Sequence, residues 1–105
     1  MKYDIWYIFC YSKYEYKNAL ERLKISIISI KSKRKIKILS WHKNLEKDIN
    51  SLIKTRKIKI YQTNKQKFSR SYLINLIPNL MLNNEKYFYF SNIDLFFHPG
   101  YFDWL

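Results

Sequence analysis

Apolar and aromatic residues occur along the chain in short blocks whose spacing alternates between strand-like and helix-like. The first block, Tyr3–Cys10, is almost continuously apolar, which is typical of a strand buried on both faces. From Glu15 to Ser32 the apolar positions recur every three or four residues, as on the buried face of a helix; they are Tyr16, Leu20, Leu23, Ile27 and Ile30. The pattern therefore predicts a strand followed by an amphipathic helix.

The next blocks repeat this order. A second strand is predicted at Lys35–Trp41, and a third at Lys57–Tyr61, where lysines alternate with isoleucines and indicate a more exposed strand. A short helical stripe separates them and consists of Leu45, Ile49, Leu52 and Ile53. We expect this part of the chain to continue the alternation of strands and helices.

The last third of the chain follows the same scheme. A helix is predicted from Ser69 to about Leu82, kinked or ended early by Pro78, and a last buried strand lies within Tyr87–Phe97. The predicted order β-α-β-α-β-α-β indicates one α/β domain with three layers: a mostly parallel sheet of about four strands with helices on both faces, as in half of a Rossmann-like fold.

Composition narrows the class of protein. The 105 residues are 48% hydrophobic and 19% aromatic, which excludes a disordered chain. The single Cys10 excludes an intramolecular disulfide and a cysteine-based zinc site, and one glycine excludes a glycine-rich phosphate loop. No apolar run approaches the length of a membrane span. We expect a cytoplasmic protein, with peripheral association with the inner face of the membrane left open.

Basic residues are concentrated in one stretch. The net charge is +12, and residues 13–67 contain 17 basic and 4 acidic residues. Such a stretch can bind a polyanion, a diphosphate or an anionic surface. The alternative is that A/T-rich codons supply lysine as the ordinary surface residue, since 16 of the 20 basic residues are lysine. Lysine is also less diagnostic than arginine of specific phosphate recognition.

Polar residues follow each predicted strand, and the last strand has the most informative ones. Asn92 and Asp94 are two positions apart, so on an extended chain they point to the same side. A carboxylate and an amide oxygen placed this way can bind a hard divalent cation. The alternative is that Asp94 caps a turn and Asn92 bonds the local backbone.

Two segments of the chain resemble a known family. The segment Phe68–Leu76 (FSRSYLINL) and the segment Tyr87–Pro99 (YFYFSNIDLFFHP) resemble the nucleotide-sugar-binding half of GT-A glycosyltransferases of the family 2 type, in which an apolar strand ends in D-x-D. The opening strand and its loop, Ile8–Tyr16, are also similar to that family. The resemblance implies a GT-A fold and a nucleotide-diphosphate-sugar donor.

The resemblance also implies site residues. Asp94 matches the second acidic position of the motif, which helps bind the metal, Mn or Mg, and the diphosphate, and Asn92 stands at the first acidic position. Arg70 and Asn75 match helix residues near the nucleotide. Tyr11 and Ser12 match the loop that receives the base.

Departures from the family limit what the resemblance implies. Asn92 has no charge, which lowers metal affinity. No acid occurs in Ser40–Lys43, where the family has an aspartate that contacts the base, and Trp41 or His42 would have to replace it. The resemblance implies an acceptor site and a catalytic base in a second half that these 105 residues do not include, so no catalytic residue is assigned and we expect a truncated domain that is inactive alone.

We therefore predict the nucleotide-sugar-binding part of a glycosyltransferase that transfers a sugar to a glycan or lipid-linked acceptor, with no nucleic-acid partner. The alternative function is a small basic, aromatic-rich module that binds nucleic acid or an anionic surface without catalysis, with Tyr11, Trp41 and Tyr61 as stacking surfaces. A third interpretation is a degenerate remnant without activity.

Overall fold

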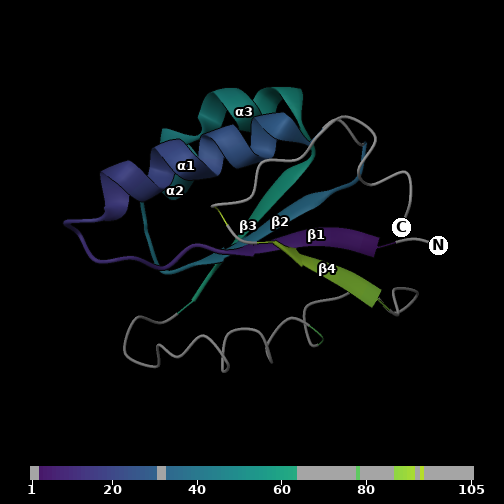
Figure 1. Ribbon diagram of the computed structural model, residues 1–105, viewed down its shortest axis with the longest axis horizontal. Helices are drawn as coiled ribbons and strands as arrows, with labels where there is room; N and C mark the ends of the chain where they lie inside the picture. Colours follow the sequence, from purple (N-terminus) through teal and green to yellow (C-terminus); the bar gives the residue numbers. More distant parts are fainter. Residues whose placement is uncertain (1–2, 31–32, 64–77, 79–86, 92, 94–105) are drawn as a thin grey trace.

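The computed structural model describes residues 3–30, 33–63, 78, 87–91 and 93 (Figure 1). Its elements are β1 (Tyr3–Ile8), α1 (Tyr16–Ser29), β2 (Ile36–Ser40), α2 (Leu45–Asp48), α3 (Asn50–Thr55), β3 (Ile58–Gln62) and β4 (Tyr87–Ser91). The α/β class and the alternation of strands and helices predicted from the sequence are confirmed. The helix expected from Ser69 to Leu82 lies outside the described residues, Pro78 excepted.

The stripe between the second and third strands forms two short helices rather than one. The chain leaves helical geometry at Ile49, where φ is −112° and ψ is 21°. Ile49 is fully buried in the same core as Leu45, whereas Asn50 and Ser51 are exposed. The helix is therefore interrupted at Ile49, although the side chain of Ile49 is buried as the predicted stripe requires.

The described strands form one sheet in the order β3-β2-β1-β4, and all neighbouring strands are parallel. Ile5 of β1 is aligned with Ile36 of β2 on one side and with Tyr89 of β4 on the other. The first three strands thus proceed in one direction across the sheet, and β4 is added on the opposite side of β1. The order of strands therefore reverses next to β1.

The described helices α1, α2 and α3 lie on one face of this sheet (Figure 1). Alternate residues of β1 point into the core on that face, where Ile5 and Tyr7 are fully buried together with Phe9, the residue after the strand. The predicted stripe of α1 packs against them, with Leu20, Leu23, Ile27 and Ile30 buried and Tyr16 half-buried. The helical spacing found in the sequence thus identified the buried face of α1 correctly.

Two contacts fix α1 to its neighbours. Inside the core the Tyr7 hydroxyl and the Ser26 hydroxyl are hydrogen-bonded at 2.7 Å. At the carboxyl end of the helix, the guanidinium of Arg56 donates hydrogen bonds to the carbonyl oxygens of Ile28 and Ile30. These carbonyls lie at the end of α1, where backbone carbonyl groups have no N–H partner within the helix. Arg56 follows α3, so it connects the ends of two helices.

The described part of the chain contains no helix that is both long and apolar enough to cross a membrane.

Candidate functional site

Parallel sheets bind ligands beyond the carboxyl ends of their strands, where the strand order reverses. In this chain the reversal lies between β1 and β4, with β2 on the other side of β1. The loop after β1 begins at Phe9, and the loop after β2 begins at Trp41. These two loops and the end of β4 form one edge of the sheet, which we call the carboxyl edge.

Hydrogen bonds connect the two loops. The fully buried hydroxyl of Ser40 donates to the carbonyl oxygen of Phe9 at 2.6 Å and accepts from the backbone N–H of His42 at 3.1 Å. The backbone carbonyl of Ser40 accepts a hydrogen bond of 2.8 Å from the backbone N–H of Thr63, which follows β3. One buried serine therefore holds the ends of three neighbouring strands together.

His42 makes the next link. Its Nε2 accepts a hydrogen bond from the backbone N–H of Tyr11 at 3.0 Å, so this nitrogen does not bear the proton. The imidazole lies 4.6 Å from the ring of Tyr16 and 5.4 Å from the ring of Phe9, measured between ring centroids. His42 is thus built into the frame of the edge and orients the backbone of the loop after β1.

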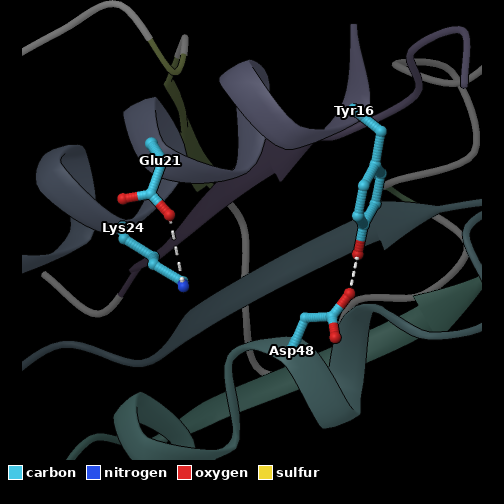
Figure 2. A network of polar contacts seen from close by, with 4 residues as sticks. All are labelled: Tyr16, Glu21, Lys24 and Asp48. Atoms are coloured by element: carbon cyan, nitrogen blue, oxygen red, sulfur yellow. Dashed lines mark hydrogen bonds and ion pairs between the residues drawn. The ribbon is translucent and has the colours of Figure 1, made fainter. Parts of the chain in front are cut away.

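Asp48 supplies a carboxylate close to this frame. The Tyr16 hydroxyl, in the first turn of α1, donates a hydrogen bond of 2.5 Å to Oδ2 of Asp48, the last residue of α2 (Figure 2). Burial is the main cause that raises the pKa of Tyr16 above its ordinary value, and the hydrogen bond and negative charge of Asp48 add to it. Tyr16 therefore remains a hydrogen-bond donor throughout the physiological range.

The same view contains a second polar pair of a different kind. Glu21 and Lys24, three residues apart on α1, approach to 3.6 Å (Figure 2). Their side chains are 63% and 31% exposed, so this pair contributes little to stability. Of the two contacts, only the one between Tyr16 and Asp48 joins different elements at the carboxyl edge.

A buried thiol lies beside this frame. Cys10 is 8% exposed and packs with Leu39, Ile8 and Trp41. Burial raises the pKa of Cys10 to about 11, against a smaller lowering by a backbone hydrogen bond from Trp41. The side chain is therefore a neutral packing group at neutral pH rather than a nucleophile.

Two of the site residues predicted from the sequence are described. Tyr11 is half-buried, and its ring packs edge-on against the ring of Phe9 with centroids 5.0 Å apart. The ring of Tyr11 is therefore partly used in packing. Ser12 is exposed in the same loop. The next aromatic residue, Tyr14, is 86% exposed, with the ammonium of Lys13 5.1 Å from its ring centroid.

The other predicted site residues lie outside the described residues: Arg70, Asn75, Asn92 and Asp94. The neighbouring Ser91 and Ile93 are both buried. Among the residues that the structure does describe, no group of three or more histidine, cysteine, aspartate or glutamate side chains could hold a metal ion. The prediction of a divalent metal on Asn92 and Asp94 stays a prediction.

Sequence reasoning missed the part played by Asp48. It lies 32 residues from Tyr16, and nothing in the local pattern connects the two residues. The only available signal was that Tyr16 is the one member of the α1 stripe with a polar tip, which needs a partner when it is half-buried. His42 was considered as a group that bonds a base, and the structure adds its bond to the Tyr11 backbone.

Comparison of the chain with protein-family models, with curated proteins and with solved structures finds no match. The resemblance to GT-A glycosyltransferases therefore depends on the residues quoted from the sequence alone.

Proposed function

We propose that this chain is the nucleotide-diphosphate-sugar-binding part of a glycosyltransferase of the GT-A, family 2-like type. One observation supports this most directly: β4 is parallel to β1 and lies beside it where the strand order reverses. In the sequence, β4 leads directly into Asn92 and Asp94. The segment that resembles the family's D-x-D strand thus begins with β4, a strand after which an α/β sheet is expected to bind its ligand.

The donor set suits the proposed cation. A carboxylate oxygen from Asp94 and an amide oxygen from Asn92 are hard ligands of the kind that Mn²⁺ and Mg²⁺ accept, together with phosphate oxygens. When bound, the cation would offset negative charge on the diphosphate leaving group. Asn92 brings no charge, so we expect weaker metal binding than two carboxylates would give.

The loop after β1 supports a place for the base. Ser12 and Tyr14 are exposed there, and Tyr14 offers a largely uncovered ring on which a base can stack. The bonds through Ser40 and His42 fix the start of this loop. A base bound here would meet a prearranged backbone, which lowers the entropy lost on binding.

The proposed reaction transfers a sugar to a glycan or a lipid-linked acceptor and requires an acceptor-binding part in addition to these residues. We propose a cytoplasmic location, with peripheral attachment to the membrane where the acceptor is lipid-linked. By itself the chain is proposed to bind the donor without turnover.

Calorimetric titration of the chain with uridine diphosphate tests the proposal. With Mn²⁺ we expect weak binding, with a dissociation constant of about 1 mM or below. Asp94→Ala or omission of the metal should abolish the heat of binding, because the carboxylate and the diphosphate are joined through the cation. The matched control is Glu46→Ala, which removes one exposed carboxylate of α2. Absence of binding with and without metal would refute the proposal.

A further inference from the structure

A second group of charged side chains lies on the other face of the sheet, opposite α1. Along β2 and β3 the isoleucines Ile36, Ile38, Ile58 and Ile60 belong to the core under the helices. The residues between them point the other way. Lys37 is aligned with Lys59, and the residues just before the aligned pair Ile36 and Ile58 are also lysines, Lys35 and Lys57. Two rows of lysine therefore face each other across neighbouring strands.

These lysines line a pocket of ≈ 280 Å³. Its lining consists of Lys35, Ile36, Lys37, Lys57, Ile58, Lys59 and Tyr61, and we call it the lysine pocket. Tyr61 forms a fixed wall, because its ring is stacked on Trp6 of β1 with centroids 5.4 Å apart and planes inclined by 22°. The pocket therefore has an aromatic side as well as a row of lysines.

The charges of the lysine pocket are poorly balanced within the described part of the chain. The ammonium of Lys37 lies 2.6 Å from the Asp4 carboxylate, and both residues are buried. Lys35, Lys57 and Lys59 are exposed, and no described acidic residue forms an ion pair with them. Like charges directly opposite on neighbouring strands destabilise a sheet. A bound anion would remove this repulsion.

We propose that the lysine pocket binds phosphate groups of a polyphosphate or of single-stranded nucleic acid, without a metal. Ammonium groups bind phosphate as point charges and need no fixed fork geometry, so the three exposed ones of Lys35, Lys57 and Lys59 around one pocket suit a flexible polyanion. The volume lies just below the ≈ 300–1,000 Å³ range of small-molecule pockets, so it fits a phosphate group or two rather than a whole nucleotide. The carboxyl edge is proposed to need a metal, and the lysine pocket is not.

Titration calorimetry with inorganic tripolyphosphate, at low ionic strength and with a chelator present, tests the proposal. The variant Lys57→Gln/Lys59→Gln should bind roughly tenfold more weakly than the unaltered chain, since it removes two of the three exposed ammonium groups of the pocket. The matched control Lys17→Gln/Lys47→Gln removes the same net charge from exposed positions of α1 and α2, and its binding should change by less than about twofold. Lys57→Arg/Lys59→Arg keeps the charge and should keep the binding.

The outcomes separate the proposal from its alternatives. Equal weakening in the two glutamine variants would mean that lysine acts only as diffuse surface charge, as biased codon usage would produce, and would overturn the proposal. Absence of binding would overturn it as well. A deoxythymidine oligonucleotide titrated in parallel identifies the source of the phosphate: tighter pocket-dependent binding than tripolyphosphate assigns nucleic acid, and weaker binding assigns free polyphosphate. Neither result depends on Asp94 or Mn²⁺, so the proposed donor site can fail independently.

Discussion

Removal of the buried ammonium of Lys37 should destabilise the protein far more than removal of any exposed lysine. Lys37 and Asp4 are 4% and 6% exposed, and Lys37 Nζ lies 2.6 Å from Asp4 Oδ2. That oxygen has no other hydrogen-bond partner among the described residues. Lys37→Met would therefore leave a carboxylate out of water with its nearest positive charge gone.

The size of the stability loss depends on how deeply the ion pair is buried. An exposed ion pair is worth about 0–1 kcal/mol, whereas loss of one partner from a buried pair costs about 3–5 kcal/mol, because the remaining charge is uncompensated. The exposed fractions place this pair in the second class. For a domain of this length we expect a fall in melting temperature of at least about 12 °C. Asp4→Val/Lys37→Met removes both charges and should recover most of the loss.

The assay is thermal and urea denaturation followed by circular dichroism. The matched control is Lys59→Met, which makes the same substitution directly opposite Lys37 at an exposed position of β3. It should leave stability unchanged or raise it by about 0.2–1 kcal/mol, since it removes a like charge from the neighbouring strand. A loss below about 1 kcal/mol for Lys37→Met would refute the reasoning and would mean that water reaches the pair.

Two further predictions concern a hydrogen bond in the core and the dependence of stability on alkaline pH. Tyr7→Phe should lower the free energy of unfolding by about 1–3 kcal/mol, because it removes the hydroxyl bonded to Ser26 inside the core. In a double-mutant cycle with Ser26→Ala, measured by urea denaturation, the two losses should not add, because each variant removes the same hydrogen bond; additive losses would contradict the prediction. Burial raises the pKa of Tyr7 and raises that of Cys10 to about 11, so the folded state holds these protons more tightly. The thiol's contribution is complete below about pH 8.5 and is lost as the pH rises through 11. The urea midpoint should therefore fall over that interval, less so in Cys10→Ala, and a constant midpoint would contradict the prediction.

Local periodicity was sufficient to predict the elements of the described sheet. Residues 3–10 form an almost continuous apolar run, and residues 35–41 contain Ile36, Ile38 and Leu39; each segment contains a strand that is buried on two faces. The spacing of Leu20, Leu23 and Ile27 identified the buried face of α1 because this face depends only on residues within one helix. The break at Ile49 was not predictable, because it depends on which core position that side chain reaches.

The contacts of the carboxyl edge could not be predicted in the same way. Tyr16 and Asp48, and likewise Tyr11 and His42, are about 30 residues apart, and their meeting depends on how two loops pass over the ends of two strands. The sequence indicated that polar residues gather at these ends, but not which donor would find which acceptor. The predicted residues Asn92 and Asp94 lie outside the described residues and await the metal-dependent titration.

The lysine pocket results from the alignment of β2 with β3 and not from the number of lysines alone. Codon bias can account for the number of lysines in the sequence, but it does not account for the register that aligns Lys37 with Lys59. Alternation sends the isoleucines of β2 and β3 under the helices, so the lysines between them must all emerge on one face. Their mutual repulsion lowers the stability of the free protein, and any ligand that relieves it binds with that energy in its favour. A rise in stability for Lys59→Met, together with weaker tripolyphosphate binding by Lys57→Gln/Lys59→Gln, would therefore be two measurements of the same repulsion.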